Sequence, residues 1–130
     1  MLGAMRVDIN KFHRKAIEVI FDEELNTINK QKIVAFVLNP KGHVLTVGWN
    51  SYIKTHPVQK EASVLFGEVY KQYLHAEVCA LTRLNKKQLG KQSAIVIIRL
   101  DSKNNLLPSC PCRICASVIH TYNIETIIHS

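Results

Sequence analysis

Two short motifs that carry metal-ligand side chains constrain the fold of this chain more than any other feature of its sequence. They are His75-Ala76-Glu77 and Pro111-Cys112-Arg113-Ile114-Cys115, and each opens a predicted helix directly after a loop. Cys112 and Cys115 are three residues apart, so both sulfurs face the same way on the first helical turn. The partial positive charge of a helix N-terminus favours thiolate over thiol. If both motifs bind one metal ion, the two helix starts must lie close together, and both are predicted where the chain approaches the edge of the sheet.

The rest of the chain predicts one α/β unit with the element order α-β-β-α-β-α-β. The turn signal Asn39-Pro40-Lys41-Gly42 joins the first two strands in a hairpin. The two strand-helix-strand units that follow imply parallel pairing, with helices on the sheet faces. Residues 60–73 are ambiguous and allow a short helix broken near Gly67. The other predicted elements are helices at 10–29, 75–85 and 112–122, strands at 33–38, 44–49, 93–100 and 124–129, and loops at 50–59 and 101–108.

Length and hydropathy set the class of protein. The 130 residues suit one domain, 1–130. The longest apolar runs, such as Ile33–Leu38 and Ala94–Ile98, have the length of buried strands, so no membrane span is predicted. The first residues lack the basic start and long apolar centre of a secretory signal. The expected compartment is therefore the cytoplasm.

The net charge of +7 allows two interpretations. A basic surplus attracts phosphates, whether they belong to a mononucleotide or to a polynucleotide. Alternatively, the lysines only keep the protein in solution. They are spread along the chain with no block of five or six like charges, so no binding tail is evident.

The cysteines and His75 point to a metal site rather than to disulfides. Three of the four cysteines fall within six residues, which suits metal or redox chemistry in a reducing compartment. One His and two Cys leave the fourth tetrahedral position of a zinc ion open, and an open position is typical of catalytic zinc. Water at that position ionises near neutral pH. Glu77 can take its proton and deliver it to a leaving amine.

The cysteines also allow other interpretations. A lone Cys-x-x-Cys also fits a redox pair or half of a structural zinc site, but a structural site needs a fourth ligand and has no use for Glu77. Cys79 lies four residues after His75 and could be a ligand in principle, or a small core residue, which is commoner for free Cys. Cys110 is not expected to bind the metal, because a third thiolate would close the site.

Both motifs together resemble the cytidine deaminase superfamily, in the branch with His-Ala-Glu followed by Pro-Cys-x-x-Cys. That branch includes deoxycytidylate deaminases, tRNA adenosine deaminases and polynucleotide-editing cytidine deaminases. The similarity runs from the hairpin at residue 33 to the last strand, about three-quarters of the chain. It implies a three-layer α/β/α sandwich with a mixed sheet, a Zn²⁺ ion held by His75, Cys112 and Cys115, Glu77 as the catalytic residue, and a homo-oligomer.

The resemblance also implies substrate contacts. In this family the side chain of Asn50, in Gly48-Trp49-Asn50, contacts the sugar, and the backbone of Ala76 lies against the base. The carbonyl of Cys110 accepts a hydrogen bond from the amino group that is lost. For two further candidates the sequence leaves alternatives open. His56 either touches a phosphate or the base, or caps a turn. Lys54 is either a phosphate contact or an exposed lysine.

Two departures from the family pattern bear on the substrate. Deoxycytidylate deaminases often have Gly after the Asn, where this chain has Ser51. Many relatives continue beyond the strand at 124–129 with a strand and a helix that help the tRNA enzymes to hold RNA, which makes tRNA the less favoured substrate here. The segment 50–57 is similar to small bacteriophage deaminases described as deoxycytidylate deaminase-like.

The leading hypothesis is hydrolysis of a cytosine nucleotide, dCMP to dUMP plus ammonia, with attack at C4 and protons carried by Glu77. The first alternative is a deaminase of cytosine or adenine in single-stranded DNA or RNA, which the net charge favours. The second alternative is a zinc-stabilised nucleotide-binding module without turnover. Glu77 opposes this alternative, because inactive relatives tend to lose that carboxylate.

Overall fold

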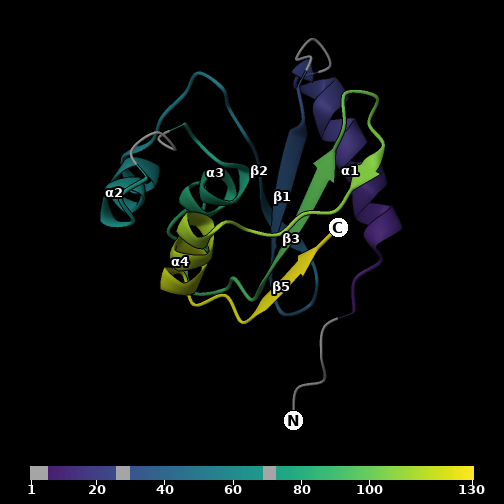
Figure 1. The fold of residues 1–130 in the computed structure, drawn as a ribbon. Coiled ribbons are helices and arrows are strands. Elements are labelled where there is room, and N and C mark those ends of the chain that lie inside the picture. The colour runs from purple at the N-terminus through teal and green to yellow at the C-terminus, as the bar shows by residue number, and fades with distance from the viewer. Residues whose placement is uncertain (1–5, 26–29, 69–72) are drawn as a thin grey trace.

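The computed structural model describes residues 6–25, 30–68 and 73–130 and shows a sheet between two layers of helices (Figure 1). Among the described residues, no helix is long and apolar enough to span a membrane. The helices are α1 (Ile9–Asp22), α2 (Pro57–Leu65), α3 (Ala76–Thr82) and α4 (Arg113–Thr121). The strands are β1 (Lys32–Leu38), β2 (Val44–Trp49), β3 (Ala94–Leu100), β4 (Leu106–Leu107) and β5 (Thr126–His129).

The sheet is mixed, as the sequence predicts. Its strand order is β2-β1-β3-β4, and β5 also pairs with β3. β1 and β2 form the predicted antiparallel hairpin, and β3 and β5 the predicted parallel pair. β1 is antiparallel to β3, with Lys32 opposite Leu100. The start of β1 and the ends of β2 and β3 therefore meet at one end of the sheet, which we call the site end.

Alternating side chains of the strands form two cores, one on each face of the sheet. Val34, Phe36 and Leu38 of β1 point to one face and pack with α1, whose buried residues include Phe12 and Ile20. On the other face, Ala35 and Val37 pack with α3 and α4, while α2 lies outside these two helices (Figure 1). The predicted α/β/α sandwich is confirmed, and all the elements that carry the two motifs lie on one face.

Several predicted boundaries differ from the structure. The first helix ends at Asp22, before Glu24 adopts a left-handed backbone conformation (φ 56°), and the last predicted residues, 26–29, lie outside the described part. The predicted loop 50–59 is wrong from Pro57 onward, because α2 begins there. The predicted loop 101–108 contains the short strand β4, paired with the end of β3.

Gly48 allows α3 to lie unusually close to β2. A Cβ atom at position 48 would lie 2.3 Å from the backbone nitrogen of Ala80 and 2.7 Å from the carbonyl oxygen of Ala76. Nearby, the hydroxyl of Thr46 donates a hydrogen bond of 2.8 Å to the carbonyl of Ala80. The absence of a side chain at Gly48 thus sets the distance between the sheet and the helix that follows His75.

Gly48→Ala should therefore destabilise the protein. Backbone atoms cannot move aside as a flexible side chain can, so α3 has to shift, and overpacking of this kind costs about 1–3 kcal/mol or more in the free energy of unfolding. Gly42→Asn is the matched control, because a Cβ there meets nothing within 4 Å and Asn tolerates the positive φ of 82°. Urea unfolding of both variants measures the difference; equal stabilities would contradict the close approach.

Candidate metal centre and active site

His75 sits at the N-cap of α3, where a hydrogen bond from outside the helix fixes its backbone. Its N–H donates to Oε1 of Gln59, at 3.2 Å. Gln59 belongs to α2 and is completely buried. The loop after β2 lies alongside the same segment, because Ser51 N–H donates to the carbonyl of Leu74. α2 and this loop together position the first motif at the site end.

The second motif reaches the same place from α4. Cys112 is the N-cap of α4 and is half-buried, and Cys115 lies one turn later and is fully buried. Nδ1 of His75 lies 3.1 Å from Sγ of Cys115 and 3.7 Å from Sγ of Cys112. The three ligand atoms all lie within 4.8 Å of one another. The structure therefore brings together the three residues that the sequence predicts as metal ligands.

These distances fit zinc. With Zn–N near 2.1 Å and Zn–S near 2.3 Å, a tetrahedral site separates nitrogen and sulfur by about 3.6 Å. The observed separations of 3.1 and 3.7 Å bracket that value. In the described ranges no other His, Cys, Asp or Glu joins the group. Cys79 is buried and is not part of the group. The described residues thus offer three ligands and leave the fourth metal position without a side chain.

The two thiols share a proton unequally in the metal-free protein. A hydrogen bond from Cys115 and the neighbouring His75 lower the pKa of Cys112 to about 3. The same hydrogen bond and deep burial raise the pKa of Cys115 well above its ordinary range. Cys112 is therefore a thiolate at neutral pH even without metal, which is the form that binds zinc.

Glu77 lies in the first turn of α3 and is only 5% exposed. Burial raises the pKa of its carboxyl group, and a side-chain hydrogen bond links it to Cys115. A raised pKa brings the carboxyl closer to the pH at which proton transfer in both directions is efficient. Glu77 is thus a buried carboxyl beside the three ligand residues without being one of them.

A small cavity of about 150 Å³ opens next to Glu77. It is much smaller than the roughly 300–1,000 Å³ of most ligand pockets, so it suits a single ring better than a whole nucleotide. Cys110 lines it, and Ala76 is buried beside Glu77. The lining residues come from five segments of the chain and are Gln31, Ile33, Tyr52, Glu77, Ile97, Arg99, Ser109 and Cys110.

The other predicted substrate contacts lie outside this cavity. Asn50 and Lys54 line a neighbouring cavity of about 470 Å³. Oδ1 of Asn50 accepts a hydrogen bond of 2.9 Å from the backbone of Ile33, which joins the end of β2 to the start of β1. His56 is the N-cap of α2, and its Nδ1 accepts a hydrogen bond from Val58 N–H at 3.1 Å. Of the alternatives weighed for His56, the structure shows the cap.

Sequence reasoning missed three polar residues that shape the site. Gln59 was placed in a loop, although the pair His56-Pro57 is a helix-start signal that could have located α2. Gln31 and Arg99 line the small cavity, but each is a single polar residue at a strand end. No local pattern marks such positions, because the pairing of β1 with β3 brings them together.

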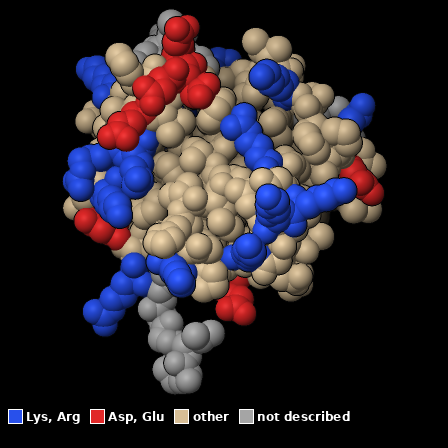
Figure 2. Space-filling view, turned by 180° about the vertical axis from the view of Figure 1, so that it is seen from behind, with Lys and Arg blue, Asp and Glu red and all other residues tan. Residues whose placement is uncertain are grey.

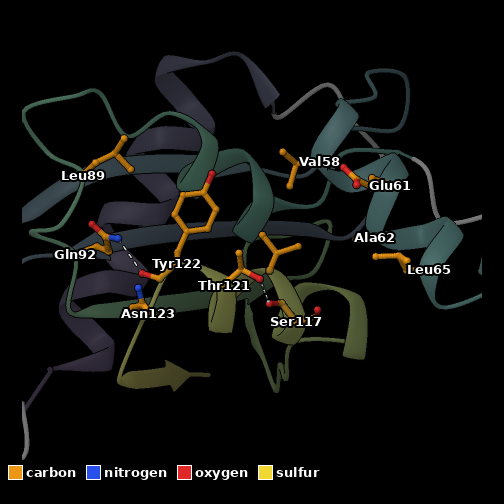
Figure 3. Close-up of a pocket in the computed structure, with 11 residues that line it drawn as sticks. Val58, Glu61, Ala62, Leu65, Leu89, Gln92, Ser117, Thr121, Tyr122 and Asn123 are labelled. Atoms are coloured by element: carbon orange, nitrogen blue, oxygen red, sulfur yellow. Dashed lines mark hydrogen bonds between the residues drawn. The ribbon is translucent and has the colours of Figure 1, made fainter.

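A larger groove, drawn in Figure 3, is not lined by any of the three metal-ligand residues. It measures about 570 Å³ and lies between α2, α4 and the segment before β3. None of the predicted site residues lines it, so the volume of a cavity does not locate the chemistry in this molecule. Its lining residues are Val58, Glu61, Ala62, Leu65, Leu89, Gln92, Ser117, Val118, Thr121, Tyr122 and Asn123.

Comparisons with known proteins agree with this geometry. The family described as the cytidine and deoxycytidylate deaminase zinc-binding region matches residues 6–130. No curated protein matches the chain. The family match covers both motifs and the whole of the described sheet, and the ligand group His75, Cys112 and Cys115 could hold the zinc that the family binds. The chain belongs to the zinc-dependent cytidine and deoxycytidylate deaminase family.

Proposed function

We propose that this protein hydrolyses the amino group of a cytosine nucleotide and converts dCMP to dUMP and ammonia. One observation carries the proposal. Glu77 is buried at a cavity of single-ring size, beside three ligand residues that leave one metal position without a side chain. A structural zinc site or a silent binding module has no use for a proton carrier at that place.

The reaction requires water to add to C4 of cytosine and ammonia to leave from it. When bound, zinc supplies the Lewis acidity that makes water a nucleophile near neutral pH. Glu77 accepts a proton from the attacking water and delivers it to N3 of the ring. Its carboxylate then takes the second proton from the new hydroxyl group and gives it to the departing amine. C4 thereby exchanges its amino group for a carbonyl oxygen, and Glu77 returns to its starting form.

Backbone groups orient the ring in this proposal. The carbonyl of Cys110 accepts a hydrogen bond from the amino group that leaves, and the backbone of Ala76 lies against the base. The positions of both residues support these roles, because Cys110 lines the cavity and Ala76 is completely buried next to Glu77. Both contacts use main-chain atoms, so replacement of the Cys110 side chain leaves its carbonyl in place.

A free nucleotide is favoured over a polynucleotide. The net charge of +7 supports single-stranded DNA or RNA as a second candidate. On the face shown in Figure 2, however, Lys and Arg side chains surround an area of other residues instead of forming a continuous stripe, and acidic side chains lie at several places around the edge. A polynucleotide channel calls for a continuous basic groove leading to the zinc.

A substrate panel tests the proposal. Zinc-loaded protein is incubated with dCMP, dCTP, cytidine and a single-stranded oligonucleotide, and uracil is measured in each. We expect dCMP to give the highest kcat/KM, with a shallow dependence on salt. If the oligonucleotide is the best substrate and its turnover falls steeply with salt, through counterion release, the polynucleotide alternative replaces this proposal. Tight dCMP binding without uracil formation would identify a silent module.

A further inference from the structure

The small cavity beside Glu77 has a buried end and an exposed end. Glu77 and Ile97 are 5% and 1% exposed and form its inner wall. Tyr52 is 38% exposed, and Gln31 is exposed at the start of β1. Arg99 lies two residues beyond Ile97 on the same face of β3 and is half-buried. Arg99 is thus more exposed than the inner wall, and its hydrogen bonds to the exposed Gln31 place its guanidinium group at the outer end.

The guanidinium group of Arg99 is held in place by neutral oxygen atoms. Its Nε and Nη2 both donate to Oε1 of Gln31, the first at 3.1 Å, and its Nη1 lies 3.5 Å from the carbonyl oxygen of Pro108. In the part of the chain that the structure describes, no carboxylate pairs with Arg99. Three of its roughly five N–H donors are used, so about two remain, together with an unneutralised charge.

Gln31 links Arg99 to the rest of the outer end. The backbone carbonyl of Gln31 accepts a hydrogen bond of 2.7 Å from the hydroxyl of Tyr52 and a longer one of 3.4 Å from Nδ2 of Asn50. The strand pairing places Ile33 opposite Arg99, and both line the cavity. The guanidinium group is therefore oriented by a network of hydrogen bonds between the start of β1 and the loop after β2.

The chemistry of the base decides what reaches Arg99. In a cytosine ring, the reacting atom C4 and the sugar-bearing atom N1 are opposite each other. A ring with C4 at Glu77 therefore directs its sugar toward the outer end of the cavity. We propose that Arg99 binds the 5′-phosphate of the nucleotide and so makes the site select a nucleotide over a nucleoside, an inference that rests on the proposed deaminase function.

Arginine suits this role better than the other cations near the site. Its planar group offers paired donors that match a phosphate, and it keeps its charge at any physiological pH. Arg99 is also the only Lys or Arg among the residues that line the cavity, all of which lie in the described part. Lys54, which the sequence suggested as a phosphate contact, lines the neighbouring cavity instead.

Kinetics with dCMP and deoxycytidine test the inference, because these substrates differ only by the phosphate. Arg99→Gln should lower kcat/KM for dCMP by about 10- to 150-fold, the loss expected for hydrogen bonds to a charged group, and should leave the weaker activity on deoxycytidine within about twofold. Arg99→Lys should lose less activity than Arg99→Gln, because lysine keeps the positive charge but lacks the paired N–H donors of the guanidinium group. Lys41→Gln, in the hairpin turn at the opposite end of the sheet, is the matched charge control and should change neither substrate.

The other outcomes overturn the inference. An equal loss on dCMP and deoxycytidine, with an unchanged melting temperature, would show that Arg99 acts on the base. An unchanged kcat/KM for dCMP would exclude a contact between Arg99 and the phosphate. A decrease seen only with an oligonucleotide would show that Arg99 binds a polynucleotide instead. If the wild type deaminates none of these compounds, the proposed function fails, and calorimetry with dUMP and deoxyuridine still tests Arg99. The wild type should bind dUMP more tightly, and Arg99→Gln should abolish that difference.

Discussion

Replacing Cys112 with alanine is expected to remove zinc from the protein and to reduce deamination to the uncatalysed background. The wild type should hold one zinc ion per chain, because His75, Cys112 and Cys115 form one group of ligand atoms within 4.8 Å. Without Cys112 only two side-chain ligands remain in that group, and catalytic zinc sites use three. Elemental analysis of protein purified without chelators, together with a dCMP assay, measures both effects.

Cys110→Ala is the matched control for metal content. It removes a thiol two residues away that is exposed and lies outside the ligand group. Zinc should stay at one equivalent in this variant. If Cys112→Ala keeps a full equivalent of zinc that cannot be removed by dialysis, the ligand assignment is wrong. If neither the wild type nor the variant takes up zinc when it is supplied, the site is not a zinc site.

Replacing Glu77 with glutamine is expected to slow deamination by about 10²–10⁴-fold while zinc content stays at one equivalent. The amide preserves the shape of the side chain but cannot carry a proton between water, N3 and the departing amine. The fold should tolerate the change, because burial already disfavours the ionised carboxylate and raises its pKa. Single-turnover rates with dCMP, zinc analysis and melting temperature separate these effects.

Glu18→Gln controls for the loss of one carboxylate. Glu18 is exposed on α1, on the opposite face of the sheet, and its replacement should leave the rate unchanged. A Glu77→Gln protein that keeps near-normal turnover would refute the proposed mechanism. One that loses its zinc would show that the carboxyl holds the metal and that the ligands are assigned wrongly.

The sequence predicts the parts of the site whose residues belong to short local motifs. His75-Ala76-Glu77 and the spacing of Cys112 and Cys115 are properties of single helix turns, so their convergence could be inferred before the fold was known. The hairpin and the parallel strands are local in the same sense, since a turn signal and two strand-helix-strand units imply them. The structure brings the ligand atoms of His75, Cys112 and Cys115 within 4.8 Å of one another, and its sheet contains the predicted hairpin and parallel pair.

The parts that the sequence does not predict depend on tertiary contacts. Gln59 holds the backbone of His75 across a distance of 16 residues, and Arg99 reaches Gln31 across 68 residues. Neither contact has a periodic pattern, because each is one polar side chain placed by the packing of α2 or by the pairing of β1 with β3. Gly48 is similar: only the position of α3 reveals why this residue has no side chain.

The separation of the ligands along the chain gives the metal a second role. His75 and Cys112 are 37 residues apart and begin different helices. An ion bound to both connects the two helices in the folded chain and is released on unfolding, so its binding free energy adds to the stability of the folded state. Metal-free chains should therefore unfold at lower temperature, so that a cell short of zinc would lose the protein itself along with its activity.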